Sequence, residues 1–267
     1  MLSLNARYYR WFPAEEHLGY AEEALVLDPS ETAFLLVDVY LPGGGGEEDE
    51  SGHGEDAALS QKDYCLWRDI TVEHIGPALA AARSAGLPVV YVTNSGPRIA
   101  LARSQFARKL HQSLGFEAAD AFREEAVDPR EYHYGGVSQL CFPDAVAPQP
   151  GDYYIRKHVY SGFHATRLES LLRNLGIRNL VCVGFRLDAC LMSTALDALF
   201  RNFNVILLRD CTLASELPHE IDDMAFTRRM LVWFEALVGV TVASRDFIAA
   251  CTAGGHSGTT KGGDGQA

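Results

Sequence analysis

The chain has 267 residues, of which 48% are hydrophobic, so it can bury the core of one α/β domain or of two small ones. A formal net charge of −12 argues against nucleic acid and anionic membranes as partners. No apolar run approaches the length of a membrane span, and the N-terminus lacks the apolar core of a signal peptide. Six scattered cysteines, with no C-x-x-C pair and no zinc-type spacing, favour a cytoplasmic protein with reduced thiols.

The first half of the chain contains two strand-like runs and two helical patterns. Residues 1–30 are aromatic and acidic without clear periodicity, which predicts an N-terminal arm on the body or on a neighbouring subunit. Residues 33–39 form an almost continuous apolar run, typical of a strand buried on both faces. The glycine-rich, acidic segment 42–60 is either a solvated insertion or a lid. A helix over 64–85, a strand over 87–93, a helix over 99–114 and an irregular segment to residue 150 follow.

The second half continues the alternation. A third strand over 153–157 precedes a helix that Thr166 and Glu169 would start as a capping box and that ends near residue 176. Strands over 180–183 and 205–208 flank a helix that begins at Cys190. A helix over 221–237, a short strand over 240–243 and a helical turn to residue 251 complete the pattern. Residues 252–267 are glycine-rich and are expected to form a disordered tail.

Strand, tight turn, helix and strand over residues 178–213 make one crossover unit, whose two strands should be parallel. Six strands alternating with helices predict an α/β fold, a single-domain Rossmann-like three-layer sandwich with a six-stranded, mainly parallel sheet over residues 31–251. There is no G-x-G-x-x-G after the first strand and no P-loop motif, so nucleotide binding is weakly supported.

Three chemically useful residues follow three of these strands. Asp38 ends the first strand, Lys157 ends the third, and Cys190 begins the helix after the fourth. With the usual strand order 3-2-1-4, the first and fourth strand tips are neighbours, and Lys157 must reach inward from further out. A cation and a helix N-terminus favour a thiolate, and a carboxylate can accept the thiol proton and later protonate a departing nitrogen.

Taken singly, each of these residues has a simpler explanation. Cys190 alone would be a small buried hydrophobe, Asp38 a loop cap and Lys157 a surface residue. The segments around them change this balance: LLVDVY at 35–40, IRKHVYSGFHATRLESLLRNLGIRNLVCVG at 155–184, and DACLMSTALDALFRNFNVILLRDCTLA at 188–214. In this order they resemble the isochorismatase-like cysteine hydrolase superfamily, and the resemblance covers roughly residues 31–250.

The resemblance implies that Asp38, Lys157 and Cys190 form a catalytic triad in a homo-oligomer, a dimer or tetramer. The namesake isochorismatases cleave a vinyl ether and lack the cysteine, so its presence implies hydrolysis of a C–N bond through an acyl-enzyme. The segment HVYSGFHAT is most similar to the members that hydrolyse ureido or carbamoyl-type amides, which predicts a small amide or ureido substrate.

Two departures from the family pattern concern the turn before the cysteine and the metal. Relatives carry a small residue or Thr followed by Thr, entered by a non-proline cis peptide, where this chain has Arg186 and Leu187. The implied oxyanion hole uses the backbone N–H groups of Arg186 and Cys190, so it can survive the change. Nicotinamidases carry Asp-x-His and a further His after the first catalytic strand, whereas this chain has only His53 there, which predicts no metal and no cofactor.

Candidate substrate-binding residues lie near the predicted strand tips: Tyr40, Asn94, Tyr160, Phe163 and Arg186. Asn94 could bond an amide end of the substrate. The Arg186 side chain could bind a carboxylate or carbonyl-rich end, or could form an ion pair with a nearby acid such as Asp188. Two other functions stay open, a nicotinamidase-like hydrolase of cyclic or aromatic amides and a catalytically idle binding homologue.

Overall fold

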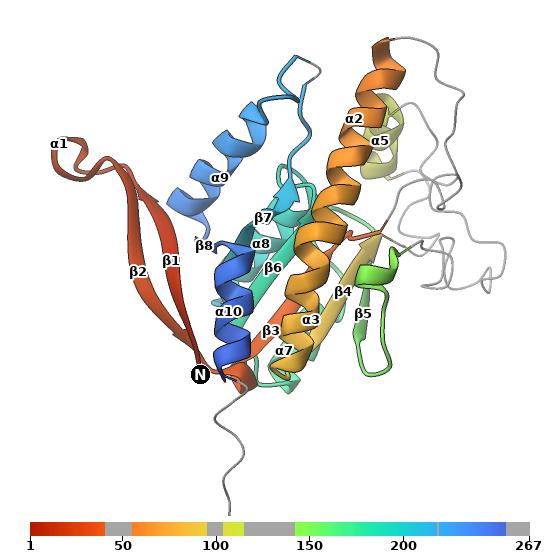
Figure 1. The fold of residues 1–267 in the computed structure, drawn as a ribbon. Coiled ribbons are helices and arrows are strands. Elements are labelled where there is room, and N and C mark those ends of the chain that lie inside the picture. Colours follow the sequence, from red (N-terminus) through yellow and green to blue (C-terminus); the bar gives the residue numbers. More distant parts are fainter. Residues whose placement is uncertain (41–54, 95–103, 115–141, 218, 255–267) are drawn as a thin grey trace, which may run out of the picture.

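A computed structural model describes residues 1–40, 55–94, 104–114, 142–217 and 219–254. One eight-stranded sheet runs through the molecule in the order β2-β1-β8-β7-β6-β3-β4-β5 (Figure 1). Its strands are β1 (Leu2–Arg10), β2 (Gly19–Leu27), β3 (Thr32–Val37), β4 (Val89–Asn94), β5 (Tyr153–Lys157), β6 (Asn179–Phe185), β7 (Asn204–Leu213) and β8 (Val240–Val242). The fold class is therefore α/β with one mostly parallel sheet, as predicted.

The predicted order of the central strands is confirmed. Within the run β5-β4-β3-β6-β7-β8 every pair of neighbouring strands is parallel, and the two strands of the crossover unit, β6 and β7, lie side by side. Residues of β3 alternate between the two faces, with Phe34 and Leu36 in one core cluster and Leu35 and Val37 in the other. Both faces of β3 are buried, which explains why its sequence is apolar throughout.

The prediction of six strands and of an N-terminal arm is wrong. β1 and β2 form an antiparallel hairpin that joins the sheet beside β8, and only its far end, which carries α1, extends away from the rest of the molecule (Figure 1). Leu2, Leu4 and Ala6 are buried on one side of β1, whereas the residues between them are exposed. This period of two covers only five residues before the pattern is lost in RYYR, so it is too short to stand out in the sequence.

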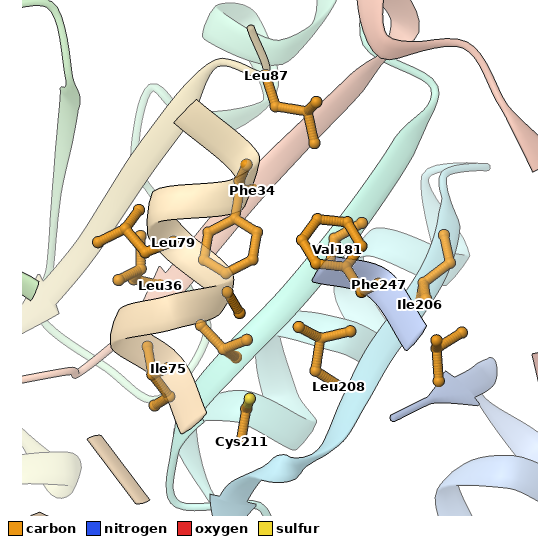
Figure 2. Packing of buried hydrophobic residues seen from close by; sticks show 14 of the residues in the cluster. Phe34, Leu36, Ile75, Leu79, Leu87, Val181, Ile206, Leu208, Cys211 and Phe247 are labelled. Atoms are coloured by element: carbon orange, nitrogen blue, oxygen red, sulfur yellow. The ribbon is translucent and has the colours of Figure 1, made fainter. Parts of the chain in front are cut away.

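Helices cover both faces of the sheet. One face carries α2 (Glu55–Asp69), the π-helix η3 (Ile70–Ile75), α3 (Gly76–Ser84) and α10 (Ser244–Gly254). Figure 2 shows this core, in which Phe34 of β3 stacks on Phe247 of α10 with their ring centroids 5.8 Å apart. The other face carries α7 (Leu168–Asn174), α8 (Cys190–Phe200) and α9 (Ala225–Leu237).

The remaining elements are short or peripheral. They are α1 (Ala14–His17), α5 (Gln105–Leu114) and the 3-10 helices η1 (Pro29–Glu31) and η5 (Asp144–Val146).

Two predicted helices differ from the observed ones in extent. The helix predicted over 64–85 begins earlier and contains the π-helix, and the predicted terminal turn is the full helix α10. Of the loop predicted over 42–60, residues 55–60 belong to α2 instead, and of the disordered tail predicted over 252–267, residues 252–254 belong to α10; residues 42–54 and 255–267 lie outside the described residues. No helix in the described part of the chain is long and apolar enough to span a membrane.

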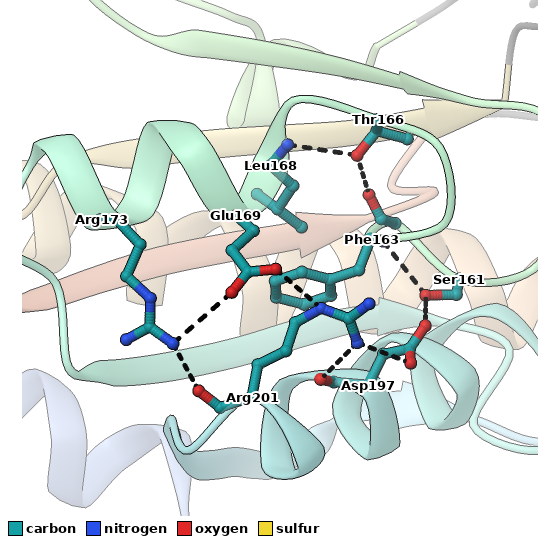
Figure 3. Close-up of polar contacts among 9 residues, drawn as sticks. Ser161, Phe163, Thr166, Leu168, Glu169, Arg173, Asp197 and Arg201 are labelled. Carbon is teal, nitrogen blue, oxygen red and sulfur yellow. Dashed lines mark hydrogen bonds and ion pairs between the residues drawn. The ribbon is translucent and has the colours of Figure 1, made fainter.

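The capping box predicted at Thr166 and Glu169 does not form. The Thr166 hydroxyl accepts a hydrogen bond from the Leu168 N–H at 3.1 Å and donates to the Gly162 carbonyl (Figure 3). Glu169 instead pairs with Arg201 and Arg173, because α7 packs beside the end of α8. The helix start is thus organised by its tertiary neighbours, which a local motif cannot anticipate.

Candidate active site

The carboxyl ends of β3, β4, β5 and β6 bring four polar residues together. Asp38 directly follows β3, Asn94 and Lys157 are the last residues of β4 and β5, and Cys190 begins α8 after β6. Asn94 and Lys157 are register partners across β4 and β5. The site therefore lies where open α/β sheets hold their ligands.

Lys157 reaches Asp38 and Cys190 although β4 lies between its own strand, β5, and β3. Its side chain is fully buried and crosses the end of β4 to reach the site. The ammonium nitrogen lies 2.7 Å from Asp38 Oδ2 and 3.2 Å from Cys190 Sγ, and it also donates to Asn94 Oδ1. The ammonium therefore has two hydrogen-bond acceptors, Asn94 Oδ1 and Cys190 Sγ, and an ionic partner in Asp38, which together hold the lysine in place.

Asp38 is buried and held in an uncommon backbone conformation. Only 5% of its surface is exposed, and its φ of +50° lies in the left-handed region that Asp tolerates better than most residues. The Asp38 N–H donates to the Val92 carbonyl at 2.9 Å. Both carboxylate oxygens are buried without a hydrogen-bond partner in the described part of the chain; Oδ2 forms the ion pair with Lys157, which leaves Oδ1 as an acceptor without an ionic partner. This acceptor is available to the thiol or to a substrate N–H.

A glycine makes the junction of β3 and β6 possible. Gly184 is paired with Val37 and has a φ of +115°. A Cβ at this position would lie 2.0 Å from the Val37 carbonyl oxygen. The close approach of the two strands places Asp38 beside the turn that leads from β6 to Cys190.

The environment of Cys190 favours the thiol in the resting state. Burial raises the pKa of this thiol to about 12, the Asp38 carboxylate acts in the same direction, and the Lys157 ammonium opposes both. Burial would lower the pKa of Lys157, but Asp38 and Cys190 raise it above its ordinary value. Cys190 is thus protonated near neutral pH beside a carboxylate, and the resting thiolate expected from the sequence is not supported.

The turn before Cys190 contains the backbone groups predicted to form an oxyanion hole. The Phe185–Arg186 peptide bond is cis. The Arg186 carbonyl accepts hydrogen bonds from the N–H groups of Ala189 and Leu191 at 3.0 and 3.1 Å. Because Cys190 is the first residue of α8, its N–H has no acceptor within the helix and can serve an external group.

The predicted substrate-binding residues differ in how they lie relative to the triad. Asn94 Nδ2 donates to the Tyr40 hydroxyl at 2.8 Å, so Asn94 connects Tyr40 with Lys157. Burial, followed by the Asp38 charge, raises the pKa of Tyr40 well above its ordinary value, so its hydroxyl is a neutral donor. Tyr160 is 39% exposed, and the nearby Cys190 contributes to its raised pKa, although burial contributes more.

Phe163 does not face the site. Its side chain is 5% exposed, and its ring lies 5.9 Å from the ring of Phe203 within the core beneath α7 and α8. The Arg201 guanidinium covers its other side, and Ser161 and Asp197 bond nearby (Figure 3). This position argues against the predicted contact of Phe163 with substrate.

Arg186 forms the ion pair that the sequence left open, but with a different acid. Both guanidinium Nη atoms contact the Asp63 carboxylate of α2, whereas Asp188 accepts hydrogen bonds from Ser215. Asp63 lies 123 positions before Arg186, so no local pattern indicates the pairing. The occupied guanidinium argues against a direct role in binding a substrate carboxylate.

No group of three or more His, Cys, Asp or Glu side chains suited to a metal ion occurs in the described ranges. His53 lies outside those ranges, so the expected lack of a metal stays a prediction. The described cysteines, which exclude Cys141, are all free thiols.

An α/β sheet that carries a buried carboxylate, an ammonium and a thiol at one edge defines a class of protein. The chain belongs to the isochorismatase family, because the model of the isochorismatase domain matches residues 60–234, more than half of its length. This confirms the resemblance on which the sequence argument drew.

Similar proteins agree with the family assignment. A ureidoacrylate amidohydrolase of Agrobacterium fabrum is 32% identical over 71% of this chain and 79% of its own. That of Variovorax paradoxus is 29% identical over 88% and 87%. A cysteine hydrolase from Pseudomonas syringae pv. phaseolicola has the same fold, with a TM-score of 0.61, 21% identity and coverage of 92% of this chain and 98% of its own.

Proposed function

We propose that Cys190, Asp38 and Lys157 hydrolyse a small ureido or carbamoyl-type amide through a thioester acyl-enzyme. The observation that carries this proposal is the buried ammonium of Lys157, which touches both the Asp38 carboxylate and the Cys190 sulfur. A purely structural ion pair between Lys157 and Asp38 would not require a cysteine at the N-terminus of α8.

The reaction class follows from the family. The chain is a hydrolase that acts on C–N bonds, since it belongs to the isochorismatase family and its relatives are named amidohydrolases. Its substrate is accordingly a small-molecule amide. The ureidoacrylate named for these relatives makes a ureido compound the first candidate for this chain.

Acylation begins with proton transfer, because the resting sulfur is a thiol. Cys190 Sγ attacks the carbonyl carbon while its proton moves to Asp38, and Lys157 compensates the charge on both groups. The N–H groups of Arg186 and Cys190 stabilise the oxyanion. Collapse of this intermediate breaks the C–N bond, and Asp38 returns the proton to the departing nitrogen.

Deacylation uses the same carboxylate. Water attacks the thioester carbonyl, and Asp38 accepts the proton of the water. Breakage of the C–S bond releases the acyl group as a carboxylic or carbamic acid and restores the Cys190 thiol. Asp38 protonates the departing sulfur, so over one cycle it acts twice as a base and twice as an acid, which fits a buried carboxylate whose Oδ1 has neither a hydrogen-bond nor an ionic partner in the described residues.

A screen for ammonia release tests the proposal. The panel holds ureidoacrylate, biuret, triuret and carbamoyl amino acids, with nicotinamide as the test of the aromatic alternative. We expect turnover of a ureido compound, and Cys190→Ala and Cys190→Ser should lower it by about 10⁴-fold or more. Cys65→Ser, which changes a thiol of α2 away from the site, is the matched control and should retain activity.

Three results would contradict the proposal. Substantial turnover by Cys190→Ala would exclude covalent catalysis by this residue. Hydrolysis of nicotinamide alone would show that the chain is a hydrolase of aromatic amides. No turnover of any compound would favour a catalytically idle binding homologue. Activity should also survive dialysis against a chelator, since no metal is expected.

A further inference from the structure

Helix α2 holds the side chain of Arg186 from outside the β6–α8 turn. Arg186 Nη1 lies 2.8 Å from Asp63 Oδ1, and Nη2 contacts Asp63 Oδ2, so the pairing is bidentate. Arg186 Nη1 also donates to the Ala214 carbonyl at 3.3 Å. A bidentate guanidinium–carboxylate pair fixes direction as well as distance.

An aromatic ring of the same helix supports both residues of the cis peptide. Trp67 lies one helical turn after Asp63, and the Arg186 guanidinium carbon is 4.9 Å from the centre of its ring. The ring of Phe185 lies 4.9 Å from the ring of Trp67. Asp63 and Trp67 together form what we call the α2 clamp.

The ion pair of the clamp adds little to stability. The side chains of Arg186 and Asp63 are 19% and 31% exposed, and partly exposed ion pairs contribute little to the free energy of folding. Holding a long arginine side chain in one conformation also costs conformational entropy. A contact with a small net effect on folding, built around a residue of the implied oxyanion hole, points to a role in geometry.

Arg186 is thereby restrained at two of its three groups. Its carbonyl is bonded to the Ala189 and Leu191 N–H groups, and its side chain is held by the clamp. The third group is the N–H that the proposed function assigns to the oxyanion. Misplacement of a catalytic group by about 1 Å can cost a factor of about 10² in rate.

We propose that Asp63 and Trp67 are positioning residues that aim the Arg186 N–H at the oxyanion by holding the Arg186 side chain. This inference rests on the proposed function, because it takes the cysteine acyl-enzyme and its oxyanion hole as given. It assigns to α2 a part in the reaction although neither clamp residue touches the triad.

A thionoester comparison tests the inference. Acylation is measured as the burst of p-nitrophenolate from p-nitrophenyl acetate and from the corresponding thionoacetate, with the acyl group located on Cys190 by mass spectrometry. Because a thiocarbonyl sulfur is a weak hydrogen-bond acceptor, the ratio of the two rates reports the oxyanion hole. The variants are Asp63→Asn, Asp63→Glu and Trp67→Leu.

Asp222→Asn is the matched control. Asp222 forms an exposed ion pair with Lys62, which lies next to Asp63 on α2. We expect Asp63→Asn and Trp67→Leu to lower acetate acylation by about 10-fold to 100-fold and thionoacetate acylation much less. Asp63→Glu should recover part of the loss. The urea midpoints of Asp63→Asn and Asp222→Asn should shift by similar small amounts.

The failure of the inference and that of the proposed function look different. If the native chain acylates at Cys190 but Asp63→Asn leaves the ratio of rates unchanged, the clamp has no positioning role, even if both rates fall. If the native chain acquires no acyl group at Cys190, the proposed function fails and the inference falls with it.

Discussion

At the scale of single residues, the chemistry depends on how charge is distributed over three buried groups. The Lys157 ammonium carries one positive charge, and Asp38 and Cys190 compete for it. Burial and the neighbouring Asp38 carboxylate raise the pKa of the Cys190 thiol, and the Lys157 ammonium opposes them. This arrangement places a carboxylate beside the thiol, as the proposed acylation requires.

Replacing that base should change the acidity of the thiol in a defined direction. In Asp38→Asn the repulsion between carboxylate and thiolate disappears while Lys157 remains, so the pKa of Cys190 should fall by about 1–3 units. Alkylation of Cys190 by iodoacetamide, followed by mass spectrometry across a pH series, should therefore begin at lower pH, although turnover is lost.

Asp188→Asn is the control for this experiment, because its carboxylate bonds Ser215 and lies two positions from the cysteine. Its alkylation profile should match that of the native chain. A shift of the Asp38→Asn profile to higher pH would show that Asp38 does not raise the pKa of the thiol.

At the scale of elements, the site depends on how closely β3 and β6 approach. Gly184 faces the Val37 carbonyl, and a bulge between Cys182 and Gly184 shifts the register of β6 against β7. The strand ends then place Asp38 and the turn to α8 side by side. The two strands cannot easily move apart, because β3 is buried on both faces.

Adding one methyl group at this junction should be costly. In Gly184→Ala the new Cβ would lie 2.0 Å from a backbone oxygen, and its φ of +115° is strained for alanine. We expect a loss of about 3 kcal/mol or more in the free energy of unfolding, measured by urea denaturation.

Gly176→Ala separates the two causes, since Gly176 also has a positive φ, +72°, but no atom lies within 4 Å of its added Cβ. This variant should lose only about 1–2 kcal/mol. Equal losses in both variants would mean that the close approach of β3 and β6 contributes nothing.

At the scale of the whole molecule, the N-terminal hairpin completes the sheet. Leu2, Leu4 and Leu27 are buried in the same core cluster as Phe247 of α10. Arg7 Nε lies 2.8 Å from Oε1 of Glu235, a buried carboxylate of α9. The hairpin thus covers apolar surface and compensates a buried charge.

Deleting residues 1–28 should destabilise the molecule by several kcal/mol, because each buried leucine contributes about 1.5–3 kcal/mol and Glu235 loses its partner. A second variant replaces residues 11–18 by Asn-Gly, which joins the paired residues Arg10 and Gly19 with a two-residue turn. This variant removes only the exposed tip, where Phe12 is 83% exposed.

Urea midpoints compare the two variants with the native chain. The shortened hairpin should unfold at nearly the same urea concentration as the native chain, and the deletion variant at a much lower one. If the deletion variant had the same urea midpoint as the native chain, residues 1–28 would not contribute to the stability of the fold.

The sequence by itself determined the α/β class; with the usual strand order and the family resemblance, it also predicted the convergence of Asp38, Lys157 and Cys190. Continuous apolar strands, helical periodicity and the handedness of crossover connections are local or general constraints, and together they put the ends of parallel strands on one edge. The N-terminal hairpin was not determined in this way, because its alternation spans five residues and its strands need β8 and α10 as partners.

Only the tertiary structure decided the state of the thiol and the partner of Arg186. Both depend on distances between residues far apart in the chain: burial and Asp38 raise the pKa of Cys190, and Asp63 reaches Arg186 from 123 positions away. Periodicity carries no information on such contacts, since desolvation and ion pairing arise only after the helices have packed on the sheet.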